Sequence, residues 1–192
     1  MLQPNYPEME IRRIETIGPK VGDELKTSAL QAILIALGLV LIYITFRFQW
    51  RQGIAAIITL LHDVMVVVGI FSIFDKEFTL PVIAALLTVV GYSLNDTIVI
   101  FDRIRENISK FRKRELLPLI NQSVTETLSR TLLTSGTTLM VVLALVFLGG
   151  EIIHDFAFAL LVGVLIGTYS SIYVASPTVL WLTKIAPPKT SD

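Results

Sequence analysis

The chain has 192 residues, of which 53% are apolar and only 17% are charged. Soluble domains carry about a quarter charged residues, so this balance excludes an ordinary soluble domain and indicates a membrane protein. Equal numbers of basic and acidic residues give no net field to attract nucleic acid, and the absence of cysteine excludes disulfides, thiol catalysis and cysteine-bound metal.

Residues 1–27 are polar and precede the first apolar segment. Within them, residues 9–17 alternate weakly between apolar and polar side chains, which predicts a strand that ends at Gly18-Pro19. A single strand is not stable by itself. We therefore expect residues 1–27 to be the remnant of a domain outside the membrane, followed by a lead-in to the first helix.

Five apolar segments follow, and each reaches or approaches the roughly 17–25 residues that a membrane-spanning helix needs. They are residues 28–46, 53–74, 81–101, 132–148 and 156–182. We therefore predict an all-α membrane protein with a five-helix transmembrane domain over residues 28–184. Residues 102–129 would connect the third and fourth spans, and residues 185–192 would form a tail.

The connections between the predicted spans alternate in charge. Lysine and arginine dominate the first and third connections, and Lys184 and Lys189 follow the fifth span. The other two connections carry four acidic residues, Asp75, Glu77, Glu151 and Asp155. The positive-inside rule then places the N-terminus outside and the C-terminus in the cytoplasm. An odd number of spans with an external N-terminus implies a missing upstream span or a partner that supplies it.

The basic connection at residues 104–129 has two interpretations. Its pattern fits an amphipathic helix that lies along the membrane surface before the chain turns inward. It fits an ordinary solvated basic loop equally well.

The third span carries a polar stretch inside an otherwise apolar run, residues 81–101. Its acidic member, Asp96, shares one helix face with Tyr92 and Ser93. A carboxylate near the centre of a spanning helix costs about 2.5–3.5 kcal/mol even on lenient insertion scales. A chain that tolerates this either satisfies the carboxylate with a partner or uses its proton.

Arg130 lies at the start of the fourth span, at a depth that we expect to be similar to that of Asp96. Because consecutive helices usually pack as neighbours, we expect the two side chains to face each other. The arginine favours the charged aspartate and loss of water favours the neutral one, so movement of the arginine would let Asp96 bind a proton. We interpret the pair as a proton relay. The alternative is a static ion pair that only holds the helices together. The same polar stripe includes Glu126, Thr134, Thr137 and Thr138.

Other polar residues in the spans are secondary candidates. His62 and Asp63, near the middle of the second span, fit a relay role or a structural hydrogen-bond role. Asn95 and Thr97 are expected to form hydrogen bonds between helices.

Small residues repeat at four-residue spacing in the fifth span, at Gly163, Gly167 and Ser171. Such a stripe lets another helix approach closely. We interpret it as a packing feature only.

These motifs resemble the SecF family. Residues 91–97 (GYSLNDT), running into 101–107 (FDRIREN), are similar to its signature. Further similarities lie in residues 18–22 (GPKVG), 129–138 (SRTLLTSGTT) and 170–176 (SSIYVAS). The similar region extends from Gly18 to Leu182. The family's first span and most of its periplasmic domain have no counterpart in it.

The resemblance implies a membrane subunit of the SecDF protein-export complex, in the resistance-nodulation-division superfamily. The bundle would correspond to spans two to six and would pair with SecD by pseudo-two-fold symmetry in the bacterial inner membrane. Family members use the residues matching Asp96 and Arg130 in proton flux. That flux is coupled to motion of a periplasmic domain that pulls preproteins leaving the SecYEG channel. The resemblance implies no enzyme activity, cofactor or metal.

Three alternatives remain open at the level of sequence. A proton-coupled exporter of small molecules or lipids would share the aspartate, although such proteins usually have much larger external loops than residues 74–80 and 149–155. A non-conducting assembly scaffold would depend on Gly163 and Gly167 rather than on Asp96. The carboxylate chemistry would also accept Na⁺ in place of H⁺. Soluble enzyme chemistry is disfavoured, since no nucleophile–base pair, metal spacing or phosphate-binding loop is present.

Overall fold

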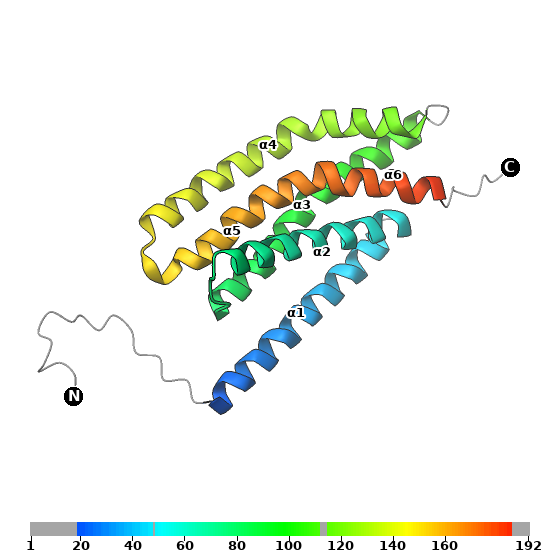
Figure 1. Cartoon of the computed structure of the whole chain (residues 1–192). Helices are drawn as coiled ribbons and strands as arrows, with labels where there is room; N and C mark the ends of the chain where they lie inside the picture. Colours follow the sequence, from blue (N-terminus) through cyan, green and yellow to red (C-terminus); the bar gives the residue numbers. More distant parts are fainter. Residues whose placement is uncertain (1–18, 48, 112–114, 186–192) are drawn as a thin grey trace, which may run out of the picture.

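The structure, a computed structural model, describes residues 19–47, 49–111 and 115–185 and is helical almost throughout these ranges (Figure 1). The strand predicted for residues 9–17 lies outside the described residues. The elements in chain order are α1 (Pro19–Arg47), α2 (Trp50–Ile73), α3 (Leu80–Lys110), α4 (Leu116–Leu148), α5 (Glu151–Ser170), η2 (Ser171–Ala175) and α6 (Ser176–Ile185).

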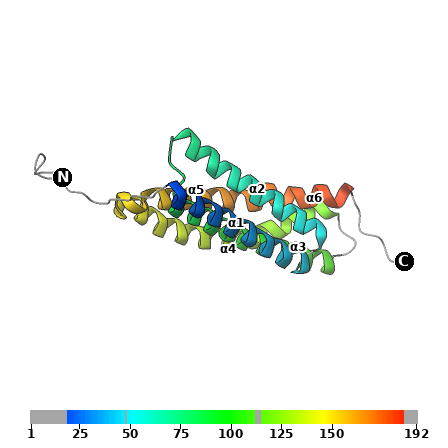
Figure 2. The same ribbon diagram turned by 90° about the horizontal axis from the view of Figure 1, so that it is seen from below.

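The helices run back and forth between two ends of a bundle (Figure 2). We call one end the basic end, because α2 begins there beside Arg47 and Arg51 and α3 ends there beyond Arg103. The opposite end, where α2 connects to α3 and α4 to α5, is the acidic end. There the Lys76 ammonium forms an ion pair with Asp155 at 2.5 Å, which ties the α2–α3 connection to α5.

Two short connections at the acidic end depend on unusual backbone angles. Gly150 has a φ of 73° and lets α4 reverse into α5 within two residues. A side chain would be strained there. Asp75, with a φ of 50°, closes the end of α2, and aspartate tolerates this left-handed region better than most residues.

Four helices are long and apolar enough to cross a membrane: α2, α3, α4 and the continuous helix from Glu151 to Ile185. In α1 the apolar stretch is shorter, Leu34–Ile44. Four of the five predicted spans therefore have matching helices, while the span at residues 28–46 and the orientation of the termini stay predictions. Large apolar side chains such as Leu61, Met140 and Phe147 are exposed, as a lipid-facing surface requires.

The connecting segment at residues 104–129 is not one surface helix. Residues 104–110 continue α3 and residues 116–129 begin α4. These helices have 31 and 33 residues. At a rise of about 1.5 Å per residue, both exceed the ~30 Å of a bilayer's hydrocarbon core, so part of each must project from it. The apolar face of each span thus continues past its last fully apolar turn, and the place of this segment relative to the membrane surface stays a prediction.

The long C-terminal helix widens into a π-helical turn at η2. Pro177 follows within one turn and has no N–H to donate to the preceding turn, and its ring would crowd the carbonyl four residues earlier. Widening the turn relieves that conflict. Ser171 and Ser176 are buried at this place, and Ser176 Oγ donates to the Ser171 carbonyl at 3.3 Å.

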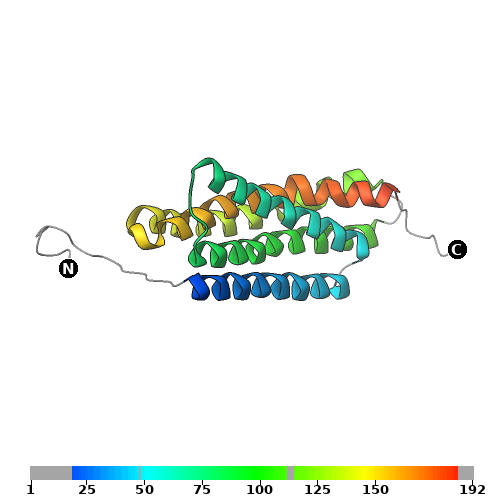
Figure 3. The ribbon, with the colours of Figure 1, turned by 60° about the horizontal axis from the view of Figure 1, so that its bottom comes forward.

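α5 packs against α2, α3 and α4, and its closest neighbour is α3. A Cβ placed on Gly163 would lie 2.0 Å from Val89 Cγ2, and one on Gly167 would lie 3.1 Å from Ser93 Cβ. Helices can come this close only when a glycine faces the contact. In Figure 1 α1 leaves the bundle at an angle from its junction with α2, and in Figure 3 it forms the outermost layer.

Candidate functional site

Asp96 lies in the interior of the bundle, where α3 meets α4 and α5, and is only 3% exposed. Ser135 Oγ of α4 donates to Asp96 Oδ2 at 3.3 Å. The same hydroxyl oxygen lies 3.2 Å from the Tyr92 hydroxyl and 2.7 Å from Thr168 Oγ1. Ser135 therefore joins three helices and is the group through which α4 reaches the carboxylate.

Arg130 does not pair directly with Asp96 in this conformation. Among the described side chains no ion pair joins the two residues, although Arg130 is near enough to attract the carboxylate by a Coulombic interaction. Arg130 is exposed and lies five residues before Ser135 on α4. The contact that the sequence predicted for the arginine is made by the serine.

The threonines of the predicted stripe on α4 serve their own helix. Thr134, Thr137 and Thr138 donate to carbonyl oxygens three or four residues earlier in α4. Hydroxyls bound in this way are satisfied locally. The structure does not bring them to Asp96.

Asp63 is the centre of a second polar cluster and is 1% exposed. Ser93 Oγ of α3 and Ser170 Oγ of α5 donate to Asp63 Oδ2 at 2.5 and 2.8 Å. His62 Nδ1 lies 3.0 Å from Asp63 Oδ1, and the His62 ring is partly exposed. Asp63 thus links α2, α3 and α5.

A third set of contacts lies between the two carboxylates. Thr97 Oγ1 and Ser171 Oγ are 3.0 Å apart, and Ser171 Oγ lies 3.4 Å from the Ser93 carbonyl oxygen. Thr97 therefore makes a contact between helices of the kind expected from the sequence. Asn95 is exposed instead, so of the two residues only Thr97 is seen to join α3 to η2.

Sequence reasoning missed Ser135, Thr168 and Ser170. A signal for Ser135 was present, because small hydroxyl residues repeat every four positions on the buried face of α4, at Ser123, Thr127, Thr131 and Ser135. That row lies beside the stripe containing Arg130. The charged residue Arg130 favoured the neighbouring, exposed face of α4 as the predicted partner of Asp96.

The basic end holds a separate polar cluster around Glu126, outside the apolar part of α4 at residues 132–148. Glu126 accepts hydrogen bonds from Asn107 Nδ2 at 2.9 Å, Gln122 Nε2 at 2.8 Å and Arg103 Nε at 2.5 Å. These hydrogen bonds, of which the one from Asn107 has the largest effect, lower the pKa of Glu126 to about 2. The cluster holds the projecting parts of α3 and α4 together. In the described ranges no group of three His, Asp or Glu side chains could hold a metal ion.

Comparisons with known proteins give a consistent result. The family model described as "Protein export membrane protein SecD/SecF, C-terminal" matches residues 1–185. A protein translocase subunit SecF from Desulfurispirillum indicum is 57% identical over 172 residues, covering 88% of this chain and 55% of the relative. A SecF from Vibrio alginolyticus is 56% identical over 174 residues, covering 91% of this chain and 55% of the relative.

A fused relative extends the comparison. A protein translocase subunit SecDF from Thermus thermophilus is 53% identical over 166 residues, covering 86% of this chain and 23% of the relative. A crystal structure of SecDF from the same genus, described as a translocon-associated membrane protein, matches with a TM-score of 0.85 and 51% identity. It covers 88% of this chain and 24% of that one. The chain spans about half the length of the SecF relatives it matches.

Proposed function

Because the chain belongs to the family of the C-terminal part of the protein-export membrane proteins SecD and SecF, we propose that it serves the Sec protein translocase as part of an accessory subunit. In this proposal, proton flux through the bundle drives late steps of preprotein export. SecD, the SecYEG channel and the translocating preprotein are its partners, in the inner membrane of a bacterial cell.

The observation that supports proton flux is the environment of Asp96. Its carboxyl group is buried at a junction of three helices and receives one described side-chain hydrogen bond, the 3.3 Å contact from Ser135. An ionised carboxylate has about four lone-pair sites for donors. A site with so few donors suits a carboxyl group that changes between charged and neutral forms.

Arg130 provides the means to favour one form over the other. It attracts Asp96 without binding it, so a shift of α4 along α3 would change their separation. Approach of the guanidinium favours release of the proton, and withdrawal favours uptake. The driving force would be the membrane potential, worth about 2.3 kcal/mol per elementary charge per 100 mV.

Association with SecD is supported by the fused relative and by the exposure of α4. The relative from Thermus thermophilus carries the SecDF name. α4 is the least buried of the four candidate spans and exposes Met140, Val141 and Phe147. An apolar face of this kind is covered by lipid or by a helix of a partner, and we assign it to the SecD side.

The test replaces Asp96 with asparagine, which keeps the shape of the side chain and removes its proton. In membrane vesicles that contain the chain with SecD and SecYEG, Asp96→Asn is expected to abolish the part of preprotein export that depends on the proton gradient. The part of export that does not depend on the gradient should continue. Asp75→Asn is the matched control, since asparagine also tolerates the left-handed backbone of that connection.

The outcomes separate the alternative functions. Undiminished gradient-dependent export with Asp96→Asn would contradict the relay and favour a scaffold role. Proton-driven movement of a small molecule or lipid in reconstituted vesicles, without any effect on preproteins, would favour an exporter. A sodium gradient that supports export in place of a proton gradient would change the coupling ion and leave the role of Asp96 intact.

A further inference from the structure

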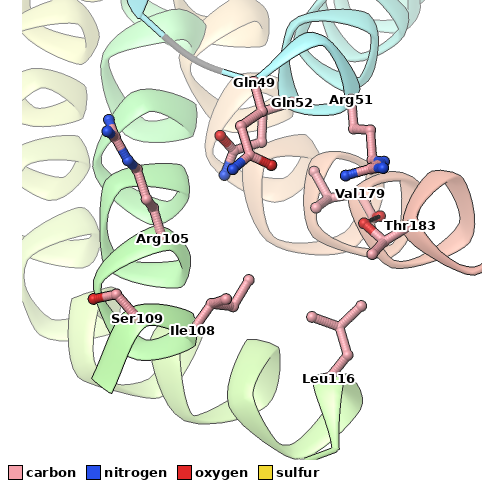
Figure 4. A pocket seen from close by; sticks show the side chains of 9 residues that line it. All are labelled: Gln49, Arg51, Gln52, Arg105, Ile108, Ser109, Leu116, Val179 and Thr183. Carbon is pink, nitrogen blue, oxygen red and sulfur yellow. Dashed lines mark hydrogen bonds between the residues drawn. The ribbon is translucent and has the colours of Figure 1, made fainter. Parts of the chain in front are cut away.

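A pocket of about 380 Å³ opens at the basic end of the bundle (Figure 4). Its wall is formed by the start of α2, the end of α3, the start of α4, and α6. Neither Asp96 nor Asp63 is part of its wall. It therefore needs a separate explanation.

The polar part of the wall carries positive charge without a compensating acid. Arg51 and Arg105 line the pocket, and the described lining residues include no aspartate or glutamate. Within the described part of the chain, neither arginine forms an ion pair. Arg51 Nε is buried and has no hydrogen-bond partner. These features predict an anionic ligand.

The side-chain oxygen of Gln52 needs a hydrogen-bond donor. It is only 5% exposed, and its Nε2 donates to the Phe101 carbonyl at 3.3 Å. Its Oε1 is buried in the pocket wall and has no partner. A buried acceptor without a partner is unfavourable, because it has lost its hydrogen bonds to water. A ligand that carries a hydroxyl beside its negative charge would satisfy it.

The start of α2 strengthens the anion site. α2 begins at Trp50, and Gln49 at its N-cap position makes no side-chain hydrogen bond to the first turn. The first N–H groups of a helix have no partner within the helix, and together with the helix dipole they favour an anion. Arg51 lies in this first turn, so both contributions act at one place.

The level of the pocket fits the surface of a membrane. Trp50 and Trp181 are 52% and 58% exposed and stand on the two helices that flank the pocket, α2 and α6. Exposed tryptophans are enriched at the headgroup level of a bilayer. The remaining wall includes the apolar side chains of Ile108, Leu116 and Val179 (Figure 4).

We propose that this pocket binds the headgroup of an anionic phospholipid, phosphatidylglycerol. The phosphodiester oxygens accept hydrogen bonds from Arg51 and from the first N–H groups of α2. The guanidinium of Arg105 lies on another side of the pocket and attracts the headgroup by its charge (Figure 4). A glycerol hydroxyl donates to Gln52 Oε1, and the glycerol backbone lies against the apolar wall. An ethanolamine or choline headgroup would instead bring a second cation toward the two arginines.

Native mass spectrometry of the purified chain in detergent micelles tests this proposal. We expect retention of phosphatidylglycerol over phosphatidylcholine, with phosphatidylmethanol in between because it has the same charge and lacks the hydroxyls. Inorganic phosphate and glycerol phosphate are the soluble probes. Tighter binding of either soluble probe than of phosphatidylglycerol would assign the pocket to a free phosphate and overturn the lipid proposal.

Substitutions of residues in the pocket wall provide the second part of the test. Arg51→Gln with Arg105→Gln should weaken retention of phosphatidylglycerol by about tenfold or more, since each basic side chain near a membrane surface contributes roughly 1 kcal/mol to binding of anionic lipid. Lys184→Gln, at the same end but outside the wall, removes one positive charge and is the charge-matched control for Arg105→Gln alone. Arg51 stacks on Trp50, with its Cζ atom 5.1 Å from the ring centroid. If loss of this contact unfolds the double variant, Arg105→Gln alone provides the test.

Equal retention of phosphatidylglycerol by the original chain and by Arg105→Gln would overturn the proposal. So would equal retention of phosphatidylglycerol and phosphatidylcholine by the original chain. A preference for phosphatidylglycerol over phosphatidylmethanol that disappears in Gln52→Met would support the assigned role of Gln52 Oε1. Asp96→Asn should leave lipid retention unchanged, so failure of the relay and failure of the lipid site can be told apart.

Discussion

Asp63 and Asp96 are both buried carboxylates, and they differ in how many donors reach them. Asp63 receives two serine hydroxyls and lies beside His62, whereas Asp96 receives a single, longer contact from Ser135. Buried charge is tolerated when it is well hydrogen-bonded. The geometry therefore favours a structural role for Asp63 and leaves Asp96 as the buried carboxylate with fewer hydrogen-bond donors.

Glu126 gives a prediction for pH dependence at the scale of one residue. Its folded-state pKa, lowered from 4.5 to about 2, lies below that of the unfolded chain. The resulting stabilisation is fully present above about pH 4.5 and is lost as the pH falls toward 2. Glu126→Gln should therefore lower the thermal unfolding midpoint at pH 7 in detergent micelles.

The difference between the original chain and Glu126→Gln should shrink steadily between pH 4.5 and pH 2. Glu77→Gln, which removes an exposed acid at the opposite end, serves as the control. A difference that stays constant down to pH 2 would mean that the lost interaction does not depend on the charge of Glu126. Salt should reduce the difference as well, because the cluster is exposed.

At the scale of elements, the contact between α3 and α5 gives a graded prediction. Alanine at Gly163 would place its Cβ against fully buried Val89, while alanine at Gly167 would be tight but closer to normal contact. Overpacking of this kind typically costs about 1–3 kcal/mol. The unfolding midpoint should fall most for Gly163→Ala and less for Gly167→Ala.

Gly91→Ala is the control for this series, because a Cβ at Gly91 on the same helix as Val89 would meet nothing within 4 Å. Val89→Ala should restore part of the stability lost in Gly163→Ala, since the two nearest atoms, Val89 Cγ1 and Cγ2, are then removed. If Gly163→Ala were as stable as Gly91→Ala, α3 and α5 could not pack as closely as described.

At the scale of the whole molecule, the absence of cysteine makes the membrane orientation easy to measure. Glu77 and Ser109 are exposed at the acidic and the basic end. With the orientation expected from loop charge, a membrane-impermeant maleimide should label Glu77→Cys in intact spheroplasts. It should label Ser109→Cys only after the membrane is opened. The reverse pattern would invert the topology and place the proposed lipid pocket in the outer leaflet.

The arrangement of the helices also explains where the two polar clusters lie. Along α2, Asp63 falls between the apolar core around Phe101 and a second apolar core around Phe71. The serines and threonines of α3 and α5 meet at the same level. Because small residues bring these helices together, the hydroxyls of Ser93 and Ser170 reach Asp63 directly, whereas Asp96 is reached by Ser135 of α4.

The sequence alone determined the membrane class, most of the spans and the presence of a carboxylate, Asp96, within one of them, because apolar runs and a charge within one are local features. It also indicated the small-residue face at Gly163. It did not identify Ser135 as the partner of Asp96 or join Ser93 and Ser170 at Asp63. Those contacts depend on the rotation of each helix about its axis, which is set by packing against neighbours distant in the chain. The pocket between Arg51, Gln52 and Arg105 is likewise a product of tertiary structure, since only the meeting of several helix ends encloses it.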